Sequence, residues 1–326
     1  MKTPSLWYVA PERVEIREVE LPALGPGDVL VQVDVCGVCT WDLFIFSGGY
    51  QEAKPYPFYF GHEGVGHVLE VGDDVKRLRE GDRVALRETT EIGRPGHGHM
   101  ASRAVLSEHM LIPIPDETLP ASSWLIEPVA CCVNAVDHAS VRCGDRVALV
   151  GCGFMGGILL EGLLMTPASE VAVFDVKPEH LERARSTRNA GQLTIHDARE
   201  IGHGRVDLEG SFDIVIETAA AESGFRLADR LARRRGKLIV FTWHHQPFAI
   251  DLGRWHKTGL TVLNVSPSIA YDFDQCFHQS IPLIRSGRID VGRLVTHRGP
   301  ADRAQDIYEK GLSKTDGYVK GLIEWS

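Results

Sequence analysis

Three short stretches in the first half of the chain carry side chains that could bind a metal ion. They are Cys36-Gly37-Val38-Cys39, then Gly61-His62-Glu63, and then Glu127-Pro128. A thiolate, an imidazole and a carboxylate are the ligand types of a zinc site that keeps one position open for a substrate. The candidate metal ligands are Cys39, His62 and either Glu63 or Glu127, and Asp42 is a candidate to orient the imidazole.

A structural zinc site is a second interpretation of Cys36-x-x-Cys39. The chain has no second Cys-x-x-Cys that would complete a four-cysteine site. The chain has seven cysteines and no secretory signal, which indicates a reducing compartment in which cysteines are buried or bind metal.

A glycine-rich loop in the middle of the chain could bind phosphate. The apolar run 147–150 predicts a buried strand, Gly151-Cys152-Gly153-Phe154-Met155-Gly156 follows it, and 158–164 has the apolar spacing of a helix. A second apolar run, 171–174, ends on Asp175. Strand, glycine turn, helix, strand and acidic residue form the context in which G-x-G-x-x-G indicates a dinucleotide site.

The physical roles of these residues favour NAD. Gly151 allows the turn, Gly153 lets the backbone approach a pyrophosphate, and Gly156 lets the helix lie close to the strand. Asp175 can accept the ribose hydroxyls of NAD and repels the 2′-phosphate of NADP. The candidate cofactor-binding residues are Gly151, Gly153, Phe154, Met155, Gly156 and Asp175.

The elements around these residues suggest two kinds of architecture. Residues 1–137 contain short alternating or apolar runs separated by glycine and proline, which predicts a β-rich, partly closed barrel. Residues 146–265 alternate strands and helices, including a strand at 212–217 and a helix at 224–235, which predicts a doubly wound parallel sheet. A helix at 273–286, a strand at 294–296 and a helix at 301–312 are expected to finish the chain.

Length and charge exclude several functions. The 326 residues allow two domains, and the net charge of −9 argues against nucleic acid or an anionic membrane as a partner. No apolar stretch is long enough to cross a bilayer, and the N-terminus lacks a signal-peptide core, so we expect a cytoplasmic protein.

The order of these motifs resembles the zinc-dependent medium-chain alcohol and polyol dehydrogenases, over essentially the whole chain. The sequences GDRV (81–84), DIVIE (213–217), THR (296–298) and DGYVK (316–320) are also similar to that family. The resemblance implies an α/β fold with a GroES-like β-rich catalytic domain, residues 1–137 and 267–326, and a Rossmann NAD-binding domain, residues 138–266. It implies one catalytic zinc bound by Cys39, His62 and a carboxylate, as in the sorbitol, threonine and glucose dehydrogenase branch.

Two departures from the family pattern matter. The connection 84–99 is short and has no cysteine, so we expect no structural zinc. The family usually has Ser or Thr as a proton relay where this chain has Trp41, and an indole N–H cannot accept a proton. Thr40, Glu63 or a water is then expected to move the proton, and Trp41 with Phe44 would form a flat apolar wall suited to a ring. The candidate catalytic residues are Cys39, Thr40, Trp41, His62 and Glu63.

Two histidine pairs have less certain roles. Gly96-His97-Gly98-His99 could bind metal, although solvated histidines are the more common case. His244-His245 follows an expected strand, where a cofactor or substrate contact competes with a plain surface turn.

The leading hypothesis is an NAD- and zinc-dependent oxidoreductase that converts a secondary alcohol of a polyol, sugar or cyclitol to a ketone, or the reverse. One alternative is the same fold reducing a conjugated double bond or catalysing a redox-neutral reaction. A second alternative is a nucleotide-binding sensor without catalysis. The resemblance also implies a homodimer or homotetramer, with the strand 260–263 pairing between subunits.

Overall fold

A computed structural model describes residues 1–50, 52, 54–87, 98–115, 118–188, 190–201, 208–266 and 272–325. Its internal contacts divide the chain into two compact units. One unit comprises Met1–Val129 and Ser280–Ser326, and the other comprises Ala130–Gln279. Each unit is described by itself below.

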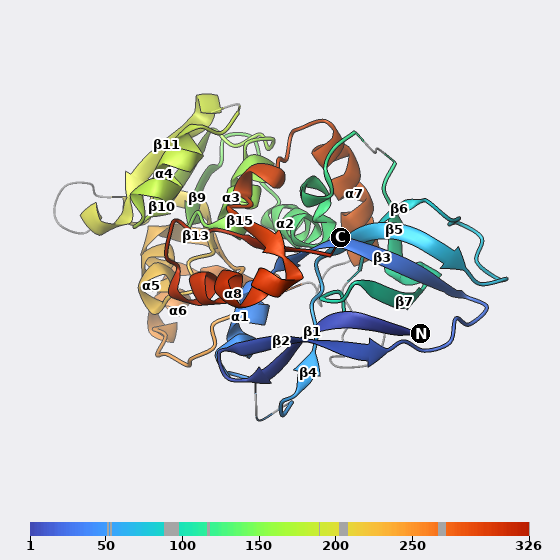
Figure 1. Ribbon diagram of the computed structural model, residues 1–326. Helices are drawn as coiled ribbons and strands as arrows, with labels where there is room; N and C mark the ends of the chain where they lie inside the picture. Colours follow the sequence, from blue (N-terminus) through green and yellow to red (C-terminus); the bar gives the residue numbers. More distant parts are fainter. Residues whose placement is uncertain are drawn as a thin grey trace. The chain divides into compact units, whose positions relative to one another are not determined.

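The first unit is rich in antiparallel strands (Figure 1). Strand β3 (Asp28–Val38) lies at its centre and pairs with β5 (Gly64–Val71), β7 (Arg103–Ser107) and β16 (Gly321–Glu324). Because β16 pairs with β3, one sheet contains strands that are far apart in the sequence. The remaining strands of this sheet are β6 (Arg83–Leu86), β8 (Leu111–Pro113) and β15 (His297–Pro300).

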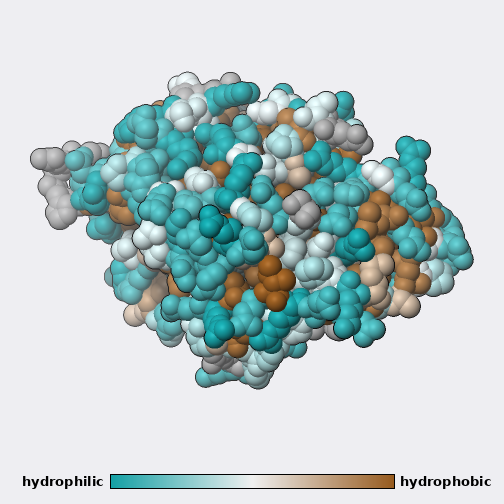
Figure 2. All heavy atoms as spheres, in the orientation of Figure 1, coloured by the Kyte–Doolittle hydropathy of each residue, from teal (hydrophilic) through white to brown (hydrophobic). Residues whose placement is uncertain are grey.

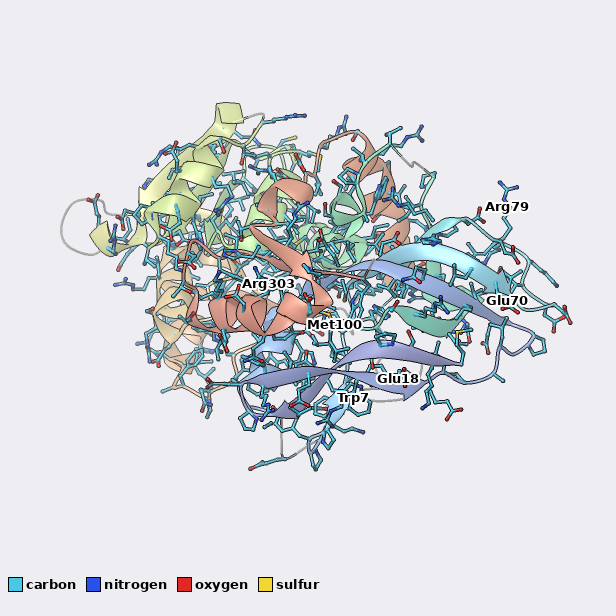
Figure 3. The ribbon with its side chains drawn as sticks, viewed as in Figure 1. Trp7, Glu18, Glu70, Arg79, Met100 and Arg303 are labelled. Carbon is cyan, nitrogen blue, oxygen red and sulfur yellow. The ribbon has the colours of Figure 1, made fainter. Side chains whose placement is uncertain are left out.

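A smaller sheet lies in the same unit and has the order β2-β1-β4. Its strands are β1 (Lys2–Ala10), β2 (Arg13–Glu20) and β4 (Phe58–Tyr59). In Figure 3, Trp7 and Glu18 mark the β1–β2 hairpin, and Glu70 and Arg79 lie at the far end of the larger sheet. Met100, which is inaccessible to solvent, accepts a hydrogen bond from the Leu6 amide and so joins the hairpin to the core. The alternating pattern expected for 1–137 is confirmed as a β-rich unit.

The second unit contains a parallel sheet of six strands in the order β11-β10-β9-β12-β13-β14. Helices alternate with the strands along the chain, so the expected doubly wound sheet is confirmed. The strands are β9 (Arg146–Val150), β10 (Glu170–Asp175), β11 (Leu193–Asp197), β12 (Phe212–Glu217), β13 (Ala232–Val240) and β14 (Thr261–Asn264). The helices between them are α3 (Phe154–Leu163), α4 (Pro178–Arg185), α5 (Glu222–Leu231) and α6 (Leu252–Thr258).

The helix expected over 224–235 ends earlier than the sequence suggested. Helix α5 stops at Leu231, and the arginines that follow belong to β13. Arg233 forms an ion pair with Asp213 beside β12, and Arg235 adopts a positive φ of 57°. Pairing with β12 therefore overrides the helix-forming tendency of the arginines.

The strand expected at 294–296 is also displaced. A 3-10 helix covers Gly292–Leu294, and the strand β15 begins at His297. Thr296 instead uses its hydroxyl to accept a hydrogen bond from the Val319 amide, and His297 then pairs with Gly321. The pairing of β15 with β16 determines where β15 begins, and the local sequence pattern does not predict that starting point.

Three helices complete the description: α1 (Thr40–Phe46), α7 (Phe273–Arg285) and α8 (Ala304–Ser313). A fourth, α2 (Ile126–Ala139), connects the two units along the chain. No helix in the described ranges is long and apolar enough to span a membrane. The face in Figure 2 is mostly hydrophilic, with small hydrophobic areas between the charged side chains.

Candidate metal centre and nucleotide site

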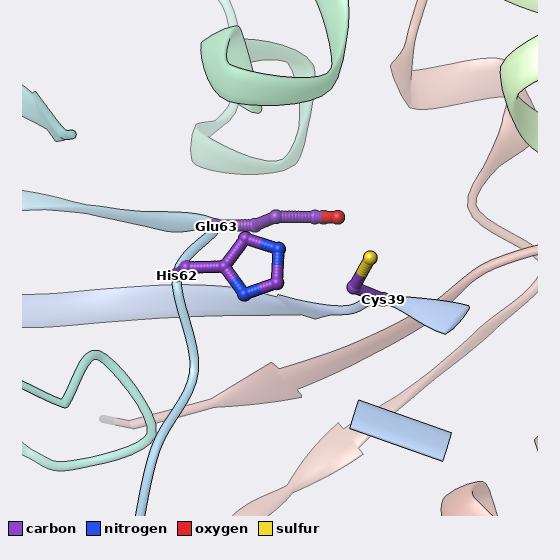
Figure 4. Close-up of side chains that lie close together, drawn as sticks. All are labelled: Cys39, His62 and Glu63. Atoms are coloured by element: carbon purple, nitrogen blue, oxygen red, sulfur yellow. The ribbon is translucent and has the colours of Figure 1, made fainter. Parts of the chain in front are cut away.

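Two neighbouring strands bring Cys39, His62 and Glu63 together. Cys39 follows the end of β3, and His62 and Glu63 directly precede β5, which pairs antiparallel with β3. One ligand atom from each side chain lies within 4.8 Å of the other two. Figure 4 shows the sulfur, the imidazole and the carboxylate directed toward a common region.

Buried Lys320 completes this cluster; it ends the DGYVK motif (316–320), but the sequence analysis assigned it no role at the site. The ammonium of Lys320 donates to Oε1 of Glu63 at 2.6 Å and lies 2.5 Å from Oε2. Burial alone would lower the pKa of Lys320, but the carboxylate of Glu63 raises it overall. The sequence signals were the DGYVK motif and a lysine directly before the mostly apolar strand β16, which needs a carboxylate partner if it is buried.

Gly37 makes room for this ion pair. A Cβ at this position would lie 2.1 Å from Oε2 of Glu63 and 3.1 Å from Cε of Lys320. The backbone amide of Gly37 also donates to the Glu63 carbonyl. A side chain at position 37 would therefore displace the carboxylate.

Burial and charge shift the pKa values within the cluster. Burial raises the pKa of the Cys39 thiol, and the adjacent His62 partly opposes this effect. Burial lowers the pKa of His62, but Cys39, Glu127 and Asp42 together raise it well above its usual value. The thiol, the imidazole and the neighbouring carboxylates thus lie close enough to shift one another's pKa values in a buried space.

Asp42 has a different role from the one expected. Its Oδ2 accepts a hydrogen bond from the Cys39 amide at 2.8 Å, and its Oδ1 accepts one from the Tyr8 hydroxyl at 3.1 Å. The Tyr8 hydroxyl is also 3.0 Å from the hydroxyl of Tyr308 in α8. Asp42 therefore fixes the backbone of Cys39 rather than bonding to the His62 ring.

Glu127 lies near this cluster without joining its tightest part. It is in the first turn of α2, is 7% exposed, and contributes to the raised pKa of His62. Its carboxylate is not among the atoms within 4.8 Å of one another. Glu63 therefore belongs to the tight group of donor atoms, whereas Glu127 acts on His62 through its charge.

The donor set fits zinc. Tetrahedral zinc with sulfur, nitrogen and oxygen ligands places those ligand atoms about 3.5 Å apart, and the three atoms here lie within 4.8 Å. Nδ1 of His62 is buried and has no hydrogen-bond partner in the described part of the chain. An unsatisfied buried nitrogen beside a thiol and a carboxylate is the donor arrangement that a divalent cation would complete.

Aromatic side chains surround Trp41 in the first turn of α1. Its ring stacks on Phe44 with a centroid distance of 5.4 Å and meets Tyr50 edge-on at 4.9 Å. Gly49 makes this possible, because a Cβ there would lie 2.1 Å from the Phe44 ring. Thr40, between Cys39 and Trp41, is exposed.

The glycine loop has the geometry that its sequence requires. Gly151 has a φ of 96°, and a Cβ there would lie 2.8 Å from the hydroxyl of Thr218. A Cβ on Gly156 would lie 2.3 Å from the Gly151 carbonyl, so only glycine lets α3 begin this close to β9. Helix α3 begins at Phe154, with Met155 in its first turn, so its free N–H groups lie at the loop.

Asp175 lies at the end of β10 and is already hydrogen-bonded. Its Oδ2 accepts from the Cys152 amide at 2.6 Å and lies 3.0 Å from Nδ1 of His180, and its Oδ1 accepts from the Lys177 amide at 2.8 Å. Burial raises the pKa of Asp175, but these hydrogen bonds lower it overall. His180 was not identified from the sequence, although it lies one turn into the helix that follows Asp175.

The two histidine pairs singled out from the sequence lie in different environments. His99 is wholly buried, and its Nδ1 accepts a hydrogen bond from the Gly64 amide, so it is not the solvated residue that was expected. Gly96 and His97, with most of the connection 84–99, lie outside the described residues. Nε2 of His244 lies 3.0 Å from Oε2 of Glu217, and His245 packs against Trp243.

Comparison with known proteins agrees with this geometry. Residues 25–116 match the family model for the alcohol dehydrogenase GroES-like domain. This range includes Cys39, His62 and Glu63, and it confirms the GroES-like fold expected for the β-rich unit.

Two curated relatives match almost the whole chain. The (R,R)-butanediol dehydrogenase of Bacillus subtilis (strain 168) is 29% identical over 95% of this chain and 96% of its own. The sorbitol dehydrogenase of Rattus norvegicus is 27% identical over 94% of this chain and 93% of its own. Among solved structures, a zinc-binding dehydrogenase of Sinorhizobium meliloti 1021 bound to NADP superposes with a TM-score of 0.84 at 23% identity, covering 99% of each chain. The structural similarity extends over both units of this chain, the GroES-like unit and the Rossmann unit with the parallel sheet.

Proposed function

We propose that the chain is a zinc-type medium-chain alcohol or polyol dehydrogenase and that it interconverts a secondary alcohol and a ketone with one zinc ion and NAD. The proposed substrate is a polyol, sugar or cyclitol. The observation that supports this proposal best is the buried cluster of Cys39, His62 and Glu63, in a chain that also carries a glycine loop ending at Asp175.

In this proposal, Cys39 and His62 hold the zinc, with Glu63 or Glu127 as the carboxylate ligand. Zinc, when bound, would act as a Lewis acid toward the alcohol oxygen, and NAD would accept the hydride. Asp42 fixes the Cys39 backbone, which holds the sulfur in place. Lys320 keeps the Glu63 carboxylate paired inside the protein, where an unpaired charge would be costly.

The substrate proton needs an acceptor other than the indole of Trp41. Glu63 is the less favoured acceptor, because both of its oxygens already lie within 2.6 Å of the Lys320 ammonium. The hydroxyl of Thr40 is exposed beside Cys39, which supports Thr40, directly or through a water, as the relay. A Thr40→Val variant should then lose turnover while it retains zinc and NADH.

The preference for NAD rests on Asp175. Its carboxylate is buried at the end of β10 and stays ionised because three hydrogen bonds lower its pKa. A charged carboxylate at this position favours ribose hydroxyls and repels a 2′-phosphate. The Sinorhizobium structure contains NADP, so the comparison of NADH with NADPH is a necessary test of this chain.

Reduction of a conjugated double bond is the less favoured function. Relatives that match over 94–95% of this chain include a butanediol dehydrogenase and a sorbitol dehydrogenase. The three clustered donor side chains also supply a site for polarising an alcohol oxygen, which hydride transfer to a carbon–carbon double bond does not require.

The domain limits 1–137 with 267–326, and 138–266, are also part of the proposal, and the two compact units support them. We further propose a homodimer or homotetramer. Strand β14 is the last strand in the order of the parallel sheet, and its outer edge, which pairs with no other described strand, is suited to pairing with a second copy. Light scattering coupled to size-exclusion chromatography would measure this mass.

The decisive experiment measures metal content and NADH binding on wild type and on Cys39→Ser. We expect about one zinc per chain in the wild type, because one donor set of this kind is described. The variant should lose zinc and turnover but still bind NADH. Two zinc ions per chain would contradict the single-site proposal, and a zinc-free protein that binds NADH would support the sensor alternative.

A further inference from the structure

The loop after β12 lies at the point where the parallel sheet changes direction. Strand β9 lies between β10 and β12, so successive crossovers leave β9 on opposite sides. In such sheets the dinucleotide lies across the carboxyl ends of the strands at this point. The loops after β9 and β12 are therefore the two that flank the nucleotide.

These two loops are in direct contact. The Thr218 hydroxyl donates to the Gly151 carbonyl at 2.7 Å, and the Thr218 amide donates to the Val150 carbonyl at 2.8 Å. A Cβ on Gly151 would lie 2.8 Å from the Ala219 amide nitrogen. A shift of Thr218 and Ala219 would thus move the first glycine of the phosphate-binding turn.

The side chain of Glu217, the last residue of β12, stabilises the loop that follows this strand. Its Oε1 accepts hydrogen bonds from the amides of Ala219 at 2.7 Å and Ala220 at 3.2 Å. Ala220 has a φ of 54°, a conformation that costs energy for a residue other than glycine. The two hydrogen bonds to the carboxylate offset that cost and fix the turn.

His244, in the loop after β13, holds the Glu217 carboxylate in place. Its Nε2 lies 3.0 Å from Oε2 of Glu217, and the two side chains are 14% and 0% exposed. The rings of Phe225 and Phe248 meet the imidazole edge-on at 5.8 and 5.1 Å, so its position is well defined. The loops after β9, β12 and β13 are thereby connected through one buried carboxylate.

We propose that His244 is a positioning residue for the nicotinamide cofactor, which acts by holding Glu217 and, through it, the loop 218–220 against the glycine turn. This inference rests on the proposed function, because it assumes that the crevice binds a nicotinamide dinucleotide. His244 itself does not need to touch the cofactor. Its loss should weaken dinucleotide binding without changing the metal cluster.

The test measures the dissociation constant of NADH by fluorescence on the full-length protein. We expect about tenfold weaker binding for His244→Leu, since a hydrogen bond to a buried carboxylate is lost. His244→Gln retains an N–H that can reach Glu217 and should restore most of the affinity. The zinc content of both variants should match the wild type.

The matched control is Glu170→Gln. Glu170 also forms a partly buried ion pair within the parallel sheet, with Arg146, but it lies at the opposite ends of the strands. It should lower the melting temperature without changing NADH affinity. Wild-type affinity in His244→Leu, or an equal loss in Glu170→Gln, would overturn the proposal. Failure of the wild type to bind NADH would instead overturn the proposed function itself.

Discussion

The ammonium of Lys320 lies 2.5 Å from Oε2 of Glu63, and the two side chains are only 3% and 1% exposed. This pair joins Glu63, which directly precedes β5, to Lys320, which directly precedes β16. The Lys320 ammonium thus holds a positive charge against the Glu63 carboxylate, which is one of the three donor groups of the candidate metal centre.

Replacing Lys320 with methionine should therefore destabilise the metal-free protein. The change leaves the Glu63 carboxylate buried without its cation, which costs about 3–5 kcal/mol. Zinc should recover part of this loss, because the metal cation replaces the ammonium as the partner of Glu63. Urea unfolding with and without zinc measures both effects. Lys310→Met, which breaks a solvent-accessible pair with Asp306, is the control and should change little.

Gly37→Ala should disturb the same site by steric contact. The added methyl would lie 2.1 Å from the Glu63 carboxylate, so the side chain or the backbone must move. We expect a loss of about 1–3 kcal/mol in unfolding free energy and weaker zinc binding. Gly27→Ala is the matched control, because a Cβ there meets no atom within 4 Å. Equal behaviour of the two variants would show that crowding at Glu63 is unimportant.

Asp175→Asn should reduce stability in a pH-dependent way. The pKa of Asp175 is lower in the folded protein than in the unfolded chain. Its charge therefore stabilises the fold above the unfolded pKa of about 3.9, and this contribution is lost as the pH falls through the folded pKa. The difference in unfolding free energy between wild type and variant should be constant near neutral pH and shrink below about pH 4. A difference that does not change with pH would exclude the ionised carboxylate as its cause.

Asp175→Asn should also relax the choice of cofactor. Without the carboxylate, repulsion of a 2′-phosphate disappears and a hydrogen-bond acceptor for the ribose weakens. We expect the ratio of NADPH to NADH dissociation constants to fall by about tenfold. Fluorescence titrations with both nucleotides provide the measurement. An unchanged ratio would contradict the role proposed for this residue.

Trp41→Ser should change which alcohols the enzyme accepts. The indole is held by Phe44 and Tyr50, so it presents a rigid aromatic group next to Cys39. Removing it should lower kcat/KM for a cyclitol by about tenfold relative to an open-chain polyol, because the flat indole no longer contacts the C–H face of the saturated ring. Tyr50→Leu removes a supporting ring only and should have a smaller effect. A parallel loss for both substrate classes would indicate that Trp41 supports the fold rather than substrate choice.

Local sequence patterns determined much of this protein. The run Phe212–Glu217 forms a strand with the expected bounds, because a short run of mostly apolar side chains is typical of a buried strand. The glycine loop was equally clear, since Gly151 and Gly156 are required by a positive φ and a close approach that other residues do not tolerate.

The tertiary structure alone decided the partners of the buried charges. Lys320 is 257 positions from Glu63, and Glu217 meets His244 across the crossover connection from β12 through α5 to β13. No periodicity encodes such pairs, because they depend on which strands become neighbours in a sheet. The partners of Asp42 also depend on tertiary structure. Its carboxylate accepts hydrogen bonds from the Cys39 amide and the Tyr8 hydroxyl, which the packing of β1, β3 and α1 brings together. Residue types and short spacings thus identified the chemistry, whereas long-range strand pairing determined which charged groups surround it.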